Sequence, residues 1–88
     1  VFQTVSDGVE ILGHVKPSAS NTYDLGTSSV VWRNIYTSDF HMTNEGLEEG
    51  NSVDGTKGSW TFQEGAEDLF LLNNKNGKKY KFKLEECK

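Results

Sequence analysis

The sequence has little of what disulfide-rich scaffolds, membrane proteins and large enzymes require. Its single cysteine, Cys87, excludes an internal disulfide and with it a disulfide-stapled secreted scaffold. Its longest apolar runs, such as residues 69–72, are far shorter than the roughly 20 residues of a membrane span, so we expect no membrane insertion. A chain of 88 residues has room for one small domain and excludes a multidomain enzyme.

Aliphatic side chains are scarce as well. Hydrophobic residues make up 34% of the chain, whereas a typical globular domain has roughly 45–50% apolar residues when glycine is included. Aromatic residues reach 11%, so the apolar volume lies in a few large rings. A chain of this length buries only about 60–65% of its unfolded surface. We therefore expect neighbouring copies of the chain to complete its interior.

Charge is distributed unevenly along the chain, which carries a net charge of −4. Residues 75–88 hold six lysines against two glutamates, a net +4, whereas residues 1–74 carry a net −8. This asymmetry suits head-to-tail or side-to-side association of copies, or a basic patch for an anionic partner.

The N-terminal region, residues 1–22, is predicted to contain short strands followed by a loop. Residues 2–5 and 9–12 have strand-like composition and are separated by the turn-forming sequence Ser6-Asp7-Gly8. Residues 17–21 are rich in proline, serine and asparagine, which favours a loop.

Residues 24–36 are the one helical candidate. Ser28 or Ser29 can cap its N-terminus, but the β-branched Val30 and Val31 are poor helix formers. We expect one or two helical turns, held by burial of Trp32, Ile35 and Tyr36 rather than by propensity.

A strand and a long loop follow. Residues 35–44 alternate with period two, which predicts a half-buried strand with Phe40 and Met42 on one face and His41 on the other. Residues 45–58 form a glycine-rich loop with almost no apolar content. This loop is a candidate receptor-contact surface, through Glu45, Glu48, Glu49, Asn51 and Asp54.

Residues 59–88 are predicted to form a three-stranded meander. The first strand, 59–64, places Trp60 and Phe62 on one face, and residues 65–67 supply the turn that follows. The other two strands, 68–75 and 78–85, flank Asn76-Gly77. This dipeptide is a strong hairpin signal in which both residues take positive φ.

Counting outward from that turn pairs Leu71 with Phe82 and Asn73 with Tyr80. One face of the hairpin is then apolar, and it carries Leu69, Leu71, Tyr80, Phe82 and Leu84. The other face carries Phe70, Leu72, Lys79, Lys81 and Lys83. Because residues 69–72 are apolar on both faces, the strand needs cover on both, and we expect another subunit to supply the second.

Residues 38–41 suggest two functional arrangements, a hydrolase relay and a zinc site, and each has a simpler explanation. Ser38, Asp39 and His41 cannot form a hydrolase relay on a strand, because Ser38 faces away from the other two. Asp39 and His41 as zinc ligands would need His14 or Cys87 as a third, and an exposed polar strand face is the simpler interpretation.

Calcium and nucleic acid are also disfavoured. The acidic loop at 44–54 does not have the ligand spacing of an EF-hand. The lysines and aromatics of the last strand alternate between its faces, unlike a surface that binds single-stranded nucleic acid. We therefore expect no catalytic residue, no metal site, no cofactor and no nucleic-acid partner.

Two stretches of the sequence carry a resemblance to a known family. The run Tyr23-Asp24-Leu25-Gly26-Thr27-Ser28-Ser29, followed by Trp32-Arg33-Asn34-Ile35-Tyr36-Thr37, resembles an element found in tail fibres and related adhesion proteins of tailed bacteriophages. Residues 54–82, with Trp60-Thr61 and Asn76-Gly77-Lys78-Lys79-Tyr80, are similar to the C-terminal end of fibres from marine phages, including those of cyanobacteria. The resemblance covers about residues 16–86.

The resemblance implies a distal, non-enzymatic segment of a tail fibre or other virion appendage. The expected fold is mainly β, with short strands, hairpins and one short helical turn, in an elongated homotrimer. The single domain, 1–88, comprises the N-terminal strands (1–22), the first resembling element and its strand (23–44), the loop (45–58) and the meander (59–88). Its turns are expected at Gly26, Asn76 and Gly77, and its trimer core from Trp32, Ile35, Tyr36, Trp60, Phe62, Phe70, Leu72 and Phe82.

The partners implied are two further copies of the chain, other virion tail proteins, and a host-surface glycan or protein. The implied location is the virion, after synthesis in the host cytoplasm. Two departures from the family pattern are visible: Val31 stands where a basic residue is common, and the self-cleaving chaperone domain that often follows the first element is absent from these residues. The resemblance therefore carries over no catalytic residue.

Two rival functions remain open. A stand-alone carbohydrate-binding module would use Trp32 or Trp60 as an exposed sugar platform. An enzyme would rest on Asp39 and His41 alone.

Overall fold

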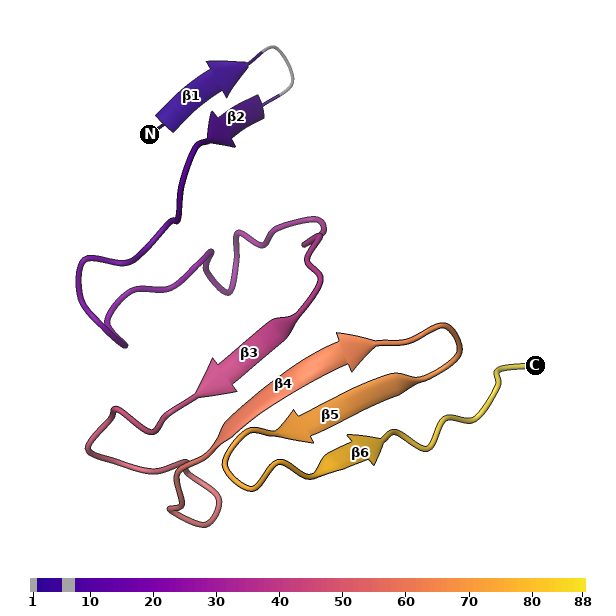
Figure 1. The fold of residues 1–88 in the computed structure, drawn as a ribbon. Coiled ribbons are helices and arrows are strands. Elements are labelled where there is room, and N and C mark those ends of the chain that lie inside the picture. The colour runs from indigo at the N-terminus through magenta and orange to yellow at the C-terminus, as the bar shows by residue number, and fades with distance from the viewer. Residues whose placement is uncertain (1, 6–7) are drawn as a thin grey trace. The chain divides into compact units, whose positions relative to one another are not determined.

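The computed structural model describes the backbone of residues 2–5 and the backbone and side chains of residues 8–88. These residues form six strands and no helix, so the prediction of a mainly β protein is confirmed (Figure 1). The chain divides into two compact units, residues 1–32 and residues 33–88. The division falls inside the predicted 23–44 element.

Unit 1 begins with a two-stranded hairpin. Strand β1 (Phe2–Val5) pairs antiparallel with strand β2 (Gly8–Ile11), and Val5 lies opposite Gly8. The first predicted strand, 2–5, is confirmed, and the second, predicted at 9–12, is present one residue earlier, at 8–11. Gly8 belongs to β2 instead of the turn, whereas Ser6 and Asp7 of the predicted turn lie outside the described residues.

The predicted helical turn within 24–36 is wrong. The Thr27 backbone N–H donates to the Val30 carbonyl at 3.0 Å, and the Val30 N–H donates to Thr27 Oγ1, also at 3.0 Å. In a helix a later N–H bonds to an earlier carbonyl, so a bond from the Thr27 N–H to the later Val30 carbonyl closes a loop instead. The predicted helix cap at Ser28 or Ser29 does not form. Instead, the Thr27 hydroxyl accepts the Val30 N–H in a loop that has no helical geometry.

Gly26 and Trp32 meet within this loop of unit 1. Gly26 has φ +88°, and a Cβ there would lie 3.5 Å from Cδ1 of the Trp32 indole. Only glycine combines that left-handed backbone with such a close approach at low cost. Burial does not accompany the contact: Trp32 is 62% exposed, and Ile35 and Tyr36 of the adjoining sequence are 70% and 92% exposed.

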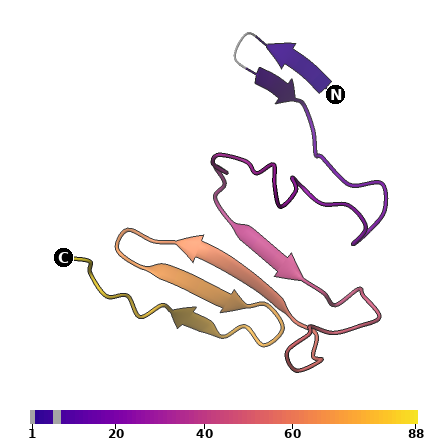
Figure 2. The same ribbon diagram turned by 180° about the vertical axis from the view of Figure 1, so that it is seen from behind.

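Unit 2 is a four-stranded antiparallel sheet (Figure 1). Its strands are β3 (Phe40–Thr43), β4 (Ser59–Glu64), β5 (Leu69–Asn73) and β6 (Lys79–Lys81), and they lie side by side in sequence order, as the view from behind also shows (Figure 2). Strand β4 has the predicted bounds. The other three are shorter than the predicted 35–44, 68–75 and 78–85.

The predicted two-residue turn at Asn76-Gly77 is also wrong. Leu71 pairs with Tyr80, not with Phe82, so the register differs from the prediction by two residues. The Asn73 side-chain oxygen accepts the backbone N–H groups of Lys75 and Asn76, which starts the turn early and makes a four-residue loop, 74–77. Gly77 takes positive φ, at +75°, but Asn76 does not.

A register difference of two residues leaves every side chain on its predicted face, because side chains alternate with period two. We call the apolar side of the sheet the aromatic face. It carries Phe40, Met42, Trp60, Phe62, Leu69, Leu71 and Tyr80, with Phe82 beyond β6. We call the other side the lysine face, and it carries His41, Thr61, Gln63, Phe70, Leu72, Lys79 and Lys81.

Ring contacts run across the aromatic face. The Phe62 ring stands 5.9 Å from Phe40 and 6.0 Å from Phe82, centroid to centroid, and the Phe62 and Phe82 rings are nearly parallel. Trp60 and Tyr80 lie 5.9 Å apart. These spacings are within the range of favourable aromatic pairs. Even so, no apolar side chain among residues 8–88 is buried, and Phe40 is 56% exposed.

Replacement of Gly77 tests the backbone conformation of the 74–77 loop. We expect Gly77→Ala to lower the free energy of unfolding by about 1–2 kcal/mol, because an L-residue at φ +75° is strained. Gly77→Asn should cost less, since asparagine tolerates this region. Gly46→Ala is the control, because a Cβ at Gly46 meets nothing within 4 Å. Urea unfolding at fixed protein concentration measures all three, and equal midpoints for the Ala and Asn variants of Gly77 would contradict the assignment.

Candidate functional site

The loop between β3 and β4 is closed at its base by Asn44. Its backbone N–H donates to the Gly58 carbonyl at 3.3 Å, and its side-chain oxygen accepts the Gly58 N–H at 2.8 Å. Its Nδ2 donates to the Thr56 carbonyl at 3.3 Å. One asparagine thus joins both ends of a loop that has almost no apolar side chain to hold it.

Asn51 and Asp54 organise the middle of the same loop. Asn51 Oδ1 accepts two backbone N–H groups, and its Nδ2 donates to Asp54 Oδ1 at 2.8 Å. The Thr56 hydroxyl donates to Asp54 Oδ1 at 2.7 Å. The chain closes so tightly here that a Cβ at Gly50 would collide with the Gly55 carbonyl. Two of the five predicted receptor-contact residues therefore have their side chains engaged within the loop.

The three predicted contact glutamates behave differently. Glu45, Glu48 and Glu49 are exposed, and their side chains form no hydrogen bond or ion pair with other described residues. They are available to an external partner, and their role in receptor contact stays a prediction.

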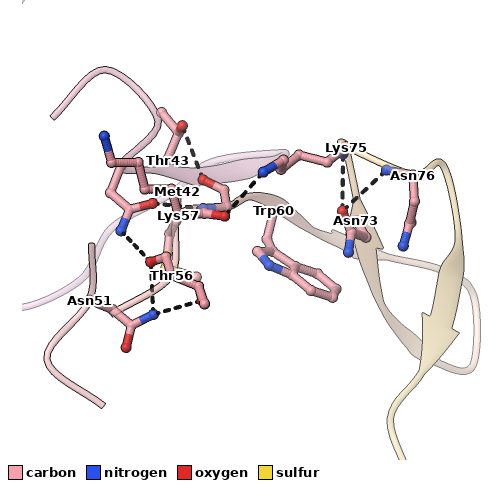
Figure 3. A pocket seen from close by; sticks show the side chains of 11 residues that line it. Met42, Thr43, Asn51, Thr56, Lys57, Trp60, Asn73, Lys75 and Asn76 are labelled. Atoms are coloured by element: carbon pink, nitrogen blue, oxygen red, sulfur yellow. Dashed lines mark hydrogen bonds between the residues drawn. The ribbon is translucent and has the colours of Figure 1, made fainter. Parts of the chain in front are cut away.

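A pocket of about 670 Å³ opens where the 44–58 loop meets the 74–77 loop (Figure 3). We call it the Trp60 pocket, since the half-buried indole of Trp60 lies among its polar lining. A Cβ at Gly58 would lie 3.2 Å from the indole nitrogen, and Tyr80 contacts the ring on the aromatic face. The strand, the glycine and the tyrosine together set the position of this ring.

The polar lining of the Trp60 pocket comes from both loops. Asn73 stands opposite Trp60 on the neighbouring strand, and Lys75 and Asn76 follow in the turn. Lys75 Nζ donates to the Lys57 carbonyl at 3.3 Å, which links the two loops across the pocket. Of the two tryptophans that sequence analysis offered as sugar platforms, Trp60 is the one that lines this pocket.

A polar cluster on the lysine face surrounds Thr61, which is 2% exposed and is the buried polar residue of the described part of the chain. Its Oγ1 lies 2.8 Å from His41 Nδ1 and accepts a bond from Asn74 Nδ2 at 3.0 Å. With Asn74 donating, the Thr61 O–H is left to donate to His41 Nδ1. The His41 proton is then on Nε2, which lies 3.9 Å from Asp39 Oδ2.

This cluster replaces the relay considered for Ser38, Asp39 and His41. His41 bonds to Thr61, a residue that sequence analysis missed, although matching Phe40 with Phe62 across the strands would have placed them together. The Thr61 hydroxyl is too buried to attack a substrate. The cluster ties β3, β4 and the turn after β5 together.

Across the described residues, no three histidine, cysteine, aspartate or glutamate side chains converge as metal ligands. Within unit 2, Cys87 therefore forms no such group with Asp39 and His41. No helix in the described part of the chain has the length and apolar character to span a membrane.

The Thr61 hydroxyl can be removed without changing the side-chain shape. We expect Thr61→Val to lower the free energy of unfolding by about 1–3 kcal/mol, because His41 and Asn74 lose their shared partner. Thr37→Val is the control, since the hydroxyl of Thr37 bonds on the exposed surface. Chemical denaturation measures the difference, and ¹⁵N shifts of His41 report its tautomer. A Thr61→Val protein as stable as the Thr37→Val protein would contradict the role of the hydroxyl.

The 44–58 loop should be sensitive to acid. The Thr56 hydroxyl, and after it the Thr56 N–H and the Asn51 amide, hold the pKa of Asp54 below its ordinary value. A carboxyl whose pKa is lower in the folded state stabilises the fold above its unfolded pKa, and this stabilisation disappears as pH falls through the folded pKa. A carboxyl ¹³C titration of Asp54 should give a higher midpoint in Thr56→Val than in the wild type. Identical midpoints would show that Thr56 does not act on Asp54.

Comparisons with known proteins add no relative to this description. No protein-family model, no curated protein and no solved structure matches the chain.

Proposed function

We propose that this chain is a non-enzymatic structural segment of a phage tail fibre or other virion appendage, assembled as an elongated homotrimer. The observation that carries the proposal is the aromatic face: its rings are ordered against one another, yet no apolar side chain of residues 8–88 is buried within one copy. The resemblance of residues 23–37 and 54–82 to fibre proteins supports the same assembly.

A second copy is the natural cover for the aromatic face. Phe40, Met42, Leu69 and Tyr80 are 44–56% exposed on one side of one small sheet. Contiguous apolar surface of this kind marks an interaction site in soluble proteins, and obligate interfaces resemble a domain core cut in half. Three such faces meeting around an axis would make the core that a single chain lacks.

The lysine face suits the outside of this assembly. Lys79 and Lys81 are exposed there, and Phe70 and Leu72 are half-buried between them and β4. Lysines on an edge strand discourage further sheet pairing. In the trimer, other virion tail proteins and a host-surface glycan or protein are the remaining partners, and the chain resides in the virion after synthesis in the host cytoplasm. No cofactor, nucleic acid or membrane takes part.

A stand-alone carbohydrate-binding module is the second candidate, and the Trp60 pocket favours it. In that case the aromatic face would stay uncovered in solution and the chain would be a monomer. The oligomeric state therefore separates the two functions.

Size-exclusion chromatography with light scattering tests the trimer. We expect the wild-type chain to run at three times its 9.8 kDa mass. Leu69→Lys should shift the chain from trimer to 9.8 kDa monomer, because it puts a charge on the aromatic face, where residue 69 faces Glu64 across the strands.

Val53→Lys is the matched control, because Val53 is 93% exposed in the 44–58 loop and should leave the trimer intact. Circular dichroism reports how much strand structure each variant keeps. A folded 9.8 kDa wild-type monomer would overturn the proposal.

A further inference from the structure

We propose that the Trp60 pocket binds an acidic saccharide, a sugar ring that carries a carboxylate, with the indole of Trp60 as the surface on which the ring stacks. The inference deepens the proposed role in host attachment and rests on it for the biological partner. Met42, Trp60 and Asn73 form the last row of the aromatic face, next to the 44–58 and 74–77 loops. In the trimer this end of the face stays open, and the rows of Phe62 and Leu69 form the shared core. The binding chemistry itself is carried by residues of unit 2 alone.

The first step is the aromatic surface. Trp60 is half-buried, is positioned by Gly58 and Tyr80, and lines a pocket large enough for one or two sugar rings. The face of an indole is electronegative, so it attracts the weakly positive C–H groups on the flat side of a pyranose. A concave site with an aromatic wall and a few convergent polar groups is the common form of a small-molecule site.

The second step is that the side-chain oxygens of the pocket are neutral and partly engaged. The amide oxygens of four asparagines all accept backbone N–H groups. The Thr56 and Thr43 hydroxyl protons are donated to Asp54 and to the Gly58 carbonyl. No carboxylate lines the pocket. The asparagines are Asn44, Asn51, Asn73 and Asn76.

The third step is that donors and positive charge remain. The Nδ2 groups of Asn73 and Asn76 have no hydrogen-bond partner among the described residues, and both residues line the pocket with Trp60 (Figure 3). Lys75 Nζ makes one bond, to the Lys57 carbonyl, which leaves further N–H groups. The Lys57 ammonium points away from the indole, so Lys75 supplies the positive charge of the pocket (Figure 3).

These features together define the ligand. A pocket with free N–H donors, the Lys75 ammonium group and no carboxylate favours a ligand that is rich in acceptors and negatively charged. A neutral sugar offers no charge to Lys75, whereas a carboxylate accepts charge-assisted bonds from lysine and amide groups. The indole adds the requirement for a ring, which separates a sugar acid from a simple anion.

Tryptophan fluorescence of the full chain tests the inference. Trp32→Phe leaves Trp60 as the single reporter, and the probes are trigalacturonate, the neutral galactose trisaccharide and acetate. We expect the Trp60 emission to give a dissociation constant for trigalacturonate at least about tenfold lower than that for the neutral trisaccharide. Acetate should produce no saturable shift. Equal affinity for the acidic and neutral sugars, an acetate response equal to that of the sugar acid, or no shift at all would overturn it.

Three variants with the same charge change make the test site-specific. Lys75→Ala removes an ammonium group. Asn73→Asp keeps the Oδ1 that holds the turn but replaces the Nδ2 donor with an anionic oxygen. Each should weaken trigalacturonate binding about tenfold, whereas Lys83→Ala, outside the pocket, should stay within about twofold. Equal weakening by Lys83→Ala would show non-specific charge attraction and overturn the site.

Light scattering on the same samples separates this inference from the proposed function. A trimer that does not bind trigalacturonate overturns the saccharide site and leaves the fibre proposal standing. A monomer that binds it overturns the trimer and leaves the saccharide site standing.

Discussion

The sheet of residues 33–88 places its large apolar side chains on one face, and that asymmetry governs the rest of the structure. Rings from β3, β4 and the segment after β6 lie in contact because the register pairs Phe40 with Phe62, and the Phe82 ring stacks against Phe62 on the same face. A row of rings on a single sheet has no second layer to pack against, and a stable domain needs two. The missing layer is what the proposed assembly provides.

The loops have few apolar contacts, and hydrogen bonds from side-chain amides stabilise them. Asn44 and Asn51 close the 44–58 loop, Asn73 starts the 74–77 turn, and Asn74 reaches Thr61 beneath the lysine face. Asparagine suits this work because its amide both donates and accepts and can mimic a backbone turn. The asparagines that hold the turn through their side-chain oxygens leave their side-chain nitrogens without a partner near Trp60. The residues that stabilise the loops therefore also supply the free donors of the pocket.

Errors in the sequence predictions share a cause. The Asn76-Gly77 signal was real, but the Asn73 side chain captured two backbone N–H groups first and lengthened the turn. The serines of residues 28–29 looked like helix caps, but Thr27 bonded Val30 in a loop. In both cases a short polar side chain competed with the backbone for local hydrogen bonds. Residue propensity does not show which of several neighbouring polar side chains will form the local hydrogen bond to the backbone.

Alternation of apolar and polar residues was enough to place β4 at its observed bounds and to assign the two faces of β3 through β6. Composition was enough to show that the aliphatic volume was too small for a buried core. Side-chain period and composition are local properties, so they can be read along the chain. Only the tertiary structure decided that Thr61 lies between His41 and Asn74, and that Trp60 shares a pocket with Asn73 and Lys75. Those contacts join residues 13 to 20 positions apart, and they depend on strand register and loop closure, which no local pattern encodes.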